Sequence, residues 1–538
     1  MQSLFAHESP QPKSVWKQRL KAFLQRFSPL SEAAPYQVSR WVFLRLLGLV
    51  YLSAFVSLWV QLEGLIGSNG ILPAERLMEL ARTQLDGRIH LFPTLLWFDA
   101  SDRFLHLLTG AGTVLAALLV IGTAPVPILA ALWVLYLSLS LGGQVFFSFQ
   151  WDTLLLEAGF LAIWLAPLTV SPRAERRAPV ARPALWLLWW LLFRLMFESG
   201  IVKLSSGDPT WANLTALRYH FETQPLPTWI GWHAHQLPAT ELWLATIGLF
   251  VVELLVPFLI LTATWLRRPA CAALVALQVV ILATGNYCFF NLLTIALCVL
   301  LLDDATWPKS LRRFVSGAEP QAAAGKPSRW PSGLLVPVSS ALFLLSLAPT
   351  TALLGIALPW PDTLSAAYRW LQPFRSINSY GLFAVMTTDR PEIIVEGSAD
   401  GQNWEPYEFR YKPGDPGRAP AFVAPHQPRL DWQMWFAALG SVEQNPWFLR
   451  FLQRLLRGSP DVEALLETNP FPDRPPLAVR AIVYDYRFTD WESRAETGDW
   501  WKRERRGEYC AAVMLNSEGN LILFEALPVL PHSVPAPP

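Results

Sequence analysis

The residue types that could do chemistry gather around one apolar run, residues 183–203. Arg194, Glu198 and Lys203 lie within this run, which is long enough to cross a membrane. Charged groups in a spanning helix are costly, so they usually face the bundle interior or a water-filled cavity. Arg194 and Glu198 have the spacing of an intrahelical ion pair. Lys203 either reaches the membrane surface or lines an outward-facing cavity, where it could act as a base.

Three carboxylates interrupt or open other apolar runs. Asp152 opens one run and either caps its helix at the membrane interface or belongs to the site. Glu157 is deeper in the same run, so we expect it to face the bundle and pair with a cation. Glu253 interrupts a later run and is a candidate partner for Arg194 or Lys203. These three carboxylates, together with Arg194, Glu198 and Lys203, are the candidate catalytic residues.

The loop at residues 204–239 follows the charged run directly and is also polar. Its candidate site residues are Asp208, Trp211, His220, Glu222, His233 and His235. The three histidines could hold zinc, but no cysteine or carboxylate lies at tight spacing beside them, so we predict no metal and no cofactor. The alternative is a rigid loop packed on the spans or on the outer domain.

These side chains belong to a chain with the composition of a multi-spanning membrane protein. Of 538 residues, 52% are hydrophobic and only 16% are charged, with 26 tryptophans. A net charge of +1 with scattered basic clusters excludes a nucleic-acid partner. About nine spans of roughly 20 residues are expected. They lie near residues 41–62, 105–122, 125–142, 152–170, 183–203, 240–264, 268–284, 287–302 and 333–357.

The lysines and arginines of the short loops orient these spans. They concentrate in the arm at residues 1–40, in the loops after the fourth and sixth spans, and in the linker at residues 303–332. The outer loops at 63–104 and 204–239 then fall on the opposite side. By the positive-inside rule, the N-terminus is cytoplasmic and the C-terminus is outside.

The character of the chain changes after about residue 372. PEIIVEGSADGQNWEPYEFRY reads as two strands around a turn at Asp400-Gly401, and AVRAIVYDYRFT alternates apolar and polar residues. AAVMLNSEGNLILFEAL reads as a hairpin, whereas DWQMWFAALG and NPWFLRFLQRLLRG have helical spacing. We predict a soluble, mainly-β, sandwich-like domain with inserted helices over residues 373–525. A Pro-rich tail follows at 526–538.

Long motifs in order resemble the lipase maturation factor family. They include QWDTLLLEAGFL, FESGIVKLSSGDPTW, LTALRYHFETQPLPTW, FRSINSYGLFAVMTTDRPEIIVEGS and PHQPRLDWQMWFAAL. The resemblance covers roughly residues 40–525. It implies a membrane protein, in the endoplasmic reticulum of eukaryotes, that secreted lipases need to reach an active state. It also implies that the C-terminal domain contacts clients, with the candidates Arg429, Asp431, Trp432, Trp435 and Trp447.

Two further features bear on location and mechanism. The short tail and the Arg-, Trp- and Pro-rich, Lys-poor composition favour a bacterial-type member in the inner membrane; a eukaryotic member would lie in the endoplasmic reticulum membrane. The membrane half is also distantly similar to the transmembrane domain of vitamin K-dependent γ-carboxylases, in which a membrane-embedded lysine acts as a base. Lys203 is the residue that carries this similarity.

Three functions therefore compete. The favoured one is a membrane-anchored maturation factor that binds folding clients without chemistry. The second is a membrane enzyme acting on a lipid-soluble or exported substrate, with a cavity lined by Asp152, Glu157, Glu198, Lys203 and Glu253. The third is a transporter that uses the same charges as a relay. The identity of the clients and the oligomeric state stay open.

Overall fold

The membrane half is a bundle of helices in the computed structural model, which describes residues 35–316, 330–357 and 359–524. Seven helical segments of this part of the chain are long and apolar enough to cross a membrane. They are α2 (Gln37–Trp59), α5 (Asp102–Ile121), α6 (Pro125–Gly142), α9 (Arg182–Ser205), the segment Ala239–Ile260, α15 (Thr264–Thr284) and α18 (Ser332–Leu353).

Nine spans are not confirmed. The runs at 152–170 and 287–302 form the shorter helices α7 (Gln150–Leu165) and α16 (Phe290–Val299). The predicted arm at residues 1–40 and the tail at 526–538 lie almost entirely outside the described residues. The linker at 303–332 is described only in part, and its first half contains the helix α17 (Lys309–Ser316).

Shorter helices connect the elements of the membrane half, and others precede or lie between the strands of the C-terminal half. In the membrane half they are α3 (Leu62–Ile66), α4 (Ala74–Gln84), α8 (Pro172–Arg177), α10 (Pro209–Ala212), α11 (Leu217–Thr223) and α12 (Trp229–His235). Those that follow α18 are α19 (Asp362–Leu371), α20 (Arg429–Ala438), α21 (Pro446–Leu456), α22 (Pro460–Glu463) and α23 (Trp491–Thr497).

The segment Ala239–Ile260 is not a regular helix. It divides into α13 (Ala239–Phe250), a wider π-helical turn at Val251–Leu255, and α14 (Val256–Ile260). Pro257 lies just after the wide turn, and its ring cannot donate the hydrogen bond that a regular α-helix requires. π-turns within helices are frequent at functional sites, and this one carries the buried Glu253.

The C-terminal half is built on an antiparallel sheet in the order β2-β1-β5-β6-β7. Its strands are β1 (Arg390–Ser398), β2 (Glu405–Pro406), β5 (Ala478–Phe488), β6 (Trp501–Leu515) and β7 (Leu521–Leu523), and a separate pair joins β3 (Glu408–Phe409) to β4 (Leu466–Thr468). Gly401 and Gly519 have positive φ in the turns predicted between strands. A β-sandwich is not confirmed, because helices rather than a second large sheet cover this sheet.

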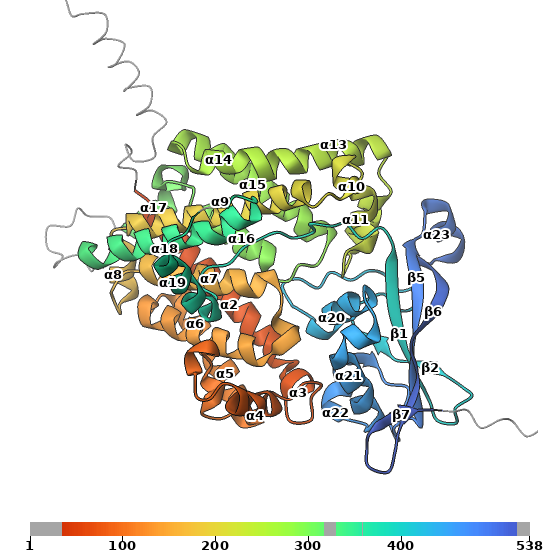
Figure 1. The fold of residues 1–538 in the computed structure, drawn as a ribbon. Helices are drawn as coiled ribbons and strands as arrows, with labels where there is room; N and C mark the ends of the chain where they lie inside the picture. Colours follow the sequence, from red (N-terminus) through yellow and green to blue (C-terminus); the bar gives the residue numbers. More distant parts are fainter. Residues whose placement is uncertain (1–34, 317–329, 358, 525–538) are drawn as a thin grey trace, which may run out of the picture.

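The sheet stands at one end of the helix bundle, with α20 and α21 between the two (Figure 1). Helix α20 packs on β1, and α21 packs on β5 and β6. Phe221 and Trp232 of the 204–239 loop pack with Ile394 of β1 and Trp501 of β6. Side chains of the membrane half therefore form a hydrophobic cluster with the sheet of the C-terminal half.

Candidate functional site

The charges predicted to line one cavity fall instead into three separate groups. The first joins Asp152 of α7 to Arg429, the first residue of α20. Nη2 and Nη1 of Arg429 lie 2.9 and 3.1 Å from the two carboxylate oxygens of Asp152. Both side chains are fully buried, and the guanidinium lies 3.5 Å from the ring centre of Phe147. The cap interpretation of Asp152 is wrong, because the N-cap residue of α7 is Phe149 and the Asp152 carboxylate binds the C-terminal half instead.

The segment that precedes α20 continues this contact along the end of α2. Ser57 Oγ accepts from the backbone N–H of Gln427 at 2.8 Å and lies 2.9 Å from His426 Nδ1. Gln61 donates to the Gln427 carbonyl and accepts from the Arg429 N–H, at 2.8 and 2.9 Å. Side chains of the membrane half thus satisfy backbone groups of the C-terminal half.

The environment of His426 makes this contact sensitive to acid. Burial, followed by the charges of Arg429 and Arg410, lowers the pKa of His426 to about 4. Between pH 6.5 and about 4 the unfolded chain therefore binds a proton that the folded chain does not. Stability should fall with acidification through this window, by up to about 1.4 kcal/mol per pH unit from this residue.

We expect His426→Asn to remove that part of the pH dependence. Thermal unfolding of the solubilised chain should show the melting temperature of the wild type falling more steeply than that of the variant below pH 6.5. Curves that stay parallel over this window would contradict the assignment.

The second group is a buried junction between α7, α9 and the segment that leads to β1. Glu157 forms an ion pair with Arg194, as predicted for a carboxylate facing the bundle. Its other oxygen accepts from the Asn378 backbone N–H and from the Tyr380 hydroxyl, both at 2.8 Å. Arg194 also donates to the Asn378 carbonyl at 2.8 Å. The buried charges of α7 and α9 therefore hold the connecting segment.

Glu198 does not form the predicted pair with Arg194. One of its oxygens accepts from Thr350 Oγ1 of α18 at 2.6 Å, and the other accepts from the Tyr380 backbone N–H at 2.9 Å. The i, i+4 spacing allows the pair, but the closer partner of Arg194 is Glu157 on the neighbouring helix α7. Glu198 contributes to the same junction.

The third group is the ion pair of Lys203 and Glu253. Lys203 Nζ donates to both oxygens of Glu253, at 2.7 and 2.8 Å, and to the Ser199 carbonyl at 3.1 Å. Both side chains are buried, so the interpretation that Lys203 reaches the membrane surface is wrong. The pair lines a cavity of about 180 Å³. Asp152, Glu157 and Glu198 do not line it, so the predicted five-residue cavity is not formed.

The outer-loop candidates mostly bind the C-terminal half. Asp208 accepts from the Met386 backbone N–H, and Trp211 donates to the Phe383 carbonyl at 3.0 Å. Glu222 accepts from the Phe488 N–H at 3.0 Å, and the ring of His233 lies 5.2 Å from that of Trp491.

His220 and His235 are also packed rather than free. His220 lines the cavity, with Nε2 3.2 Å from the Tyr287 hydroxyl. Burial, with a smaller contribution from the Lys203 charge, lowers the pKa of His220 to about 4. His235 Nε2 lies 3.7 Å from Glu222 Oε2. Within the described residues, no group of three or more histidine, cysteine or carboxylate side chains could hold a metal ion.

The predicted client-binding side chains lie at the contact between the two halves or inside the C-terminal half. Trp432 packs edge-on against Trp151 with ring centres 4.6 Å apart, and Trp435 donates to the Thr223 carbonyl at 2.9 Å. Trp447 packs on Phe146, and Asp431 accepts from two backbone N–H groups of the loop before it. These four side chains and Arg429 are all buried. In this structure the five predicted client-binding residues therefore present no surface to a client.

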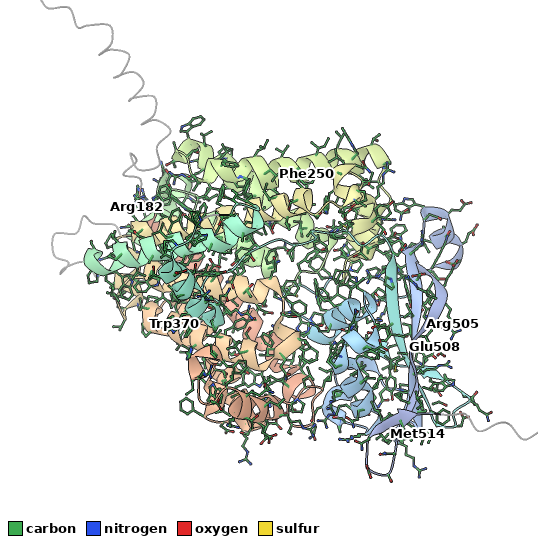
Figure 2. The ribbon with its side chains drawn as sticks, in the orientation of Figure 1. Arg182, Phe250, Trp370, Arg505, Glu508 and Met514 are labelled. Atoms are coloured by element: carbon green, nitrogen blue, oxygen red, sulfur yellow. The ribbon has the colours of Figure 1, made fainter. Side chains whose placement is uncertain are left out.

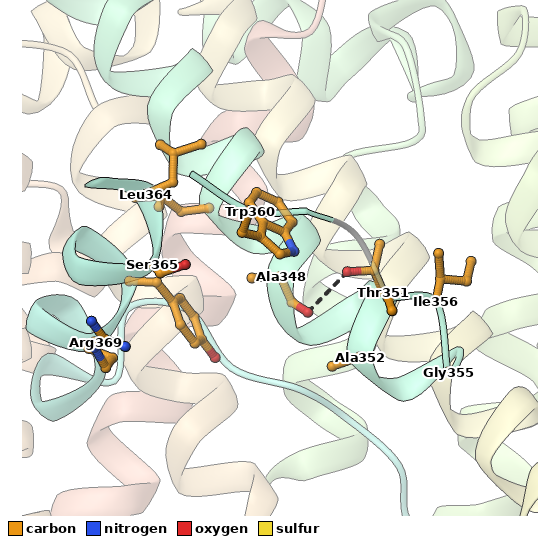
Figure 3. Close-up of a pocket in the computed structure, with 12 residues that line it drawn as sticks. Ala348, Thr351, Ala352, Gly355, Ile356, Trp360, Leu364, Ser365 and Arg369 are labelled. Carbon is orange, nitrogen blue, oxygen red and sulfur yellow. Dashed lines mark hydrogen bonds between the residues drawn. The ribbon is translucent and has the colours of Figure 1, made fainter. Parts of the chain in front are cut away.

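A second hollow, of about 500 Å³, lies between the end of α18 and α19 (Figure 3). Trp360, Leu364 and Ile356 lie around it, and Arg369 is the one ionisable group besides Tyr368 in its lining. It contains no buried pair of charges and no cluster suited to catalysis. Among the sites described, the cavity beside Lys203 is therefore the better candidate for binding a ligand.

Comparison with known sequences gives two family matches that together cover most of the chain. The family described as "Lipase maturation factor transmembrane domain" matches residues 38–309, and "Lipase maturation factor C-terminal domain" matches residues 376–511. Similar curated proteins are lipase maturation factor 2 of Gallus gallus and of Homo sapiens, each 38% identical over 89% of this chain and over 82% and 83% of the relative. Lipase maturation factor 1 of Mus musculus is 34% identical over 89% of this chain and 88% of its own length.

No solved structure matches the chain. Neither matching family is a γ-carboxylase, so the distant resemblance noted in the sequence has no support from this comparison. The relatives named above are vertebrate proteins and do not bear out a bacterial-type assignment.

Proposed function

Since the chain belongs to the lipase maturation factor family, we propose that it is a membrane-anchored maturation factor that assists the folding or assembly of secreted lipases or other exported proteins. The observation that carries this proposal is the identity to named lipase maturation factors over both halves of the chain. The internal partners of the buried charges support a binding role over a catalytic one.

We propose that the C-terminal half lies outside the cytoplasm. The basic loops support this orientation, because Arg182 lies at the end of the bundle opposite the sheet residues Arg505 and Glu508 (Figure 2). A positive excess marks the cytoplasmic side of a membrane protein. From the composition of the sequence, we place the chain in a bacterial inner membrane, with the endoplasmic reticulum membrane as the alternative.

Clients need an accessible apolar surface, and the end of α20 offers one. Leu439 is 44% exposed and lines a groove of about 690 Å³ beside the sheet. Phe436 is equally exposed and lines a different hollow, between the start of α21 and the loop before α7. Val385 is also exposed, and it directly precedes Met386, which lines the same groove as Leu439. Exposed apolar patches of soluble domains commonly bind other proteins. We therefore assign client contact to this α20 surface, defined by Val385, Phe436 and Leu439, rather than to the buried tryptophans.

A photo-crosslinking amino acid at position 439 of the full-length chain tests this assignment. It should capture newly made lipase in cells, and the same group at position 477 should not, because Leu477 is similarly exposed but does not line the groove. Capture at 477 alone, or at neither position, would overturn the α20 surface as the client site.

A further inference from the structure

The cavity beside Lys203 has features that the maturation role does not use. It lies between α9, the segment Ala239–Ile260, α15 and α16, and most of its lining is apolar, including Leu195, Leu249, Leu277 and Phe290. Three of these four elements are long and apolar enough to span a membrane. The cavity therefore lies between helices able to span a membrane, and the outer-loop residues Leu217, His220 and Phe221 also line it.

The mouth of the cavity lies on faces that other elements leave uncovered. Ala245 of α13 and Val280 of α15 line the cavity and are themselves exposed, Val280 by 57%. Figure 1 shows α13 and α14 along the outer edge of the bundle, with no helix beyond them. Exposed apolar side chains on spanning helices face lipid. A ligand that enters between α13 and α15 would therefore come from the bilayer.

One buried polar atom in the wall of the cavity lacks a partner. Asn291 Nδ2 donates to Gln278 Oε1 at 2.8 Å, but among the described residues no donor meets the buried Asn291 Oδ1. A buried acceptor without a hydrogen bond is costly, and such atoms in folded proteins call for an explanation. A hydroxyl group on a ligand would supply the missing donor.

Charge and size restrict the ligand further. Lys203 and Glu253 neutralise each other, so the cavity has no spare charge to offset a buried ionic headgroup. Its volume of about 180 Å³ is close to that of an apolar cavity known to hold a molecule the size of benzene. The space accommodates the end of a lipid but not a whole one.

We propose that this cavity binds the hydroxyl-bearing end of a neutral lipid alcohol, whose hydroxyl donates to Asn291 Oδ1 and whose chain leaves between α13 and α15 into the bilayer. The proposal does not rest on the maturation role, because binding can be measured without any lipase.

The test uses the full-length chain in phosphatidylcholine nanodiscs with a hexadecanol probe that carries a photoactivatable diazirine near its hydroxyl end. Labelling is mapped to peptides by mass spectrometry. The probe should label cavity residues of α15 and α16, and its methyl ether should label them about tenfold less because it cannot donate a hydrogen bond. Equal labelling by the two probes would overturn the assignment of Asn291 as the polar partner.

Two variants on α13 test the entrance. Ala245→Trp should block the mouth and lower cavity labelling at least about tenfold, as expected when a ligand loses its path and its contacts. Leu244→Trp is the matched control, because Leu244 is exposed on the same turn but does not line the cavity. Undiminished labelling in Ala245→Trp, or an equal loss in both variants, would overturn entry between α13 and α15.

Discussion

Replacement of Arg429 by methionine is expected to loosen the C-terminal half from the membrane half. It leaves the carboxylate of Asp152 buried without its cation and removes the contact with Phe147. Removing one partner of a buried ion pair typically costs about 3–5 kcal/mol. The expected result is faster proteolysis of the C-terminal half by a protease added to nanodiscs, together with a lower unfolding temperature.

Two further variants separate charge from packing at this contact. Arg429→Lys keeps the charge but cannot reproduce the two-point contact with Asp152, so an intermediate loss is expected. Arg429→Met with Asp152→Leu removes both charges and should recover most of the stability. If Arg429→Met resists the protease as well as the wild type does, the pair does not hold the two halves together.

Lys203→Met is the second change with a large expected effect. Glu253 would remain buried at a π-turn with no cation, at a cost of about 3–5 kcal/mol. A reduced amount of folded chain after solubilisation, and a lower melting temperature, should follow.

The matched double variant Lys203→Met/Glu253→Met distinguishes structure from chemistry. Two methionines fill a similar volume without charge, and such replacements of buried pairs are often neutral or stabilising. The double variant should therefore melt near the wild type. A double variant that melts as low as Lys203→Met would show that more than the unpaired charge determines stability at this position.

The local elements followed from the sequence more reliably than their association. The turns at Gly401 and Gly519, the strand β5 and the helices α20 and α21 match the patterns of their residues. The predicted count of nine spans is not confirmed, because two of the apolar runs form the shorter helices α7 and α16. Alternation of apolar and polar residues predicts strands, but it does not show whether helices or a second sheet cover them. The predicted sandwich could therefore not be distinguished from a single sheet covered by helices.

The candidate site was predicted as a set of residues but not as an arrangement. Burial of Glu157 and its pairing with a cation follow from the cost of a lone charge among apolar residues. Its other partners, Asn378 and Tyr380, lie more than 200 residues away in the chain, and no local pattern identifies them. The same holds for Asp152 and Arg429, so residues that resembled a reaction site proved to join the two halves.

The specific activity of secreted lipase, in cells that lack the gene for this chain, tests the central claim most directly. The claim is that a C-terminal half held on the membrane half promotes lipase maturation without chemistry by Lys203. Wild type and Lys203→Met/Glu253→Met should both restore the activity, whereas Arg429→Met should not. A double variant that is folded and present at normal amounts but restores nothing would contradict the account and assign a chemical role to the Lys203–Glu253 pair.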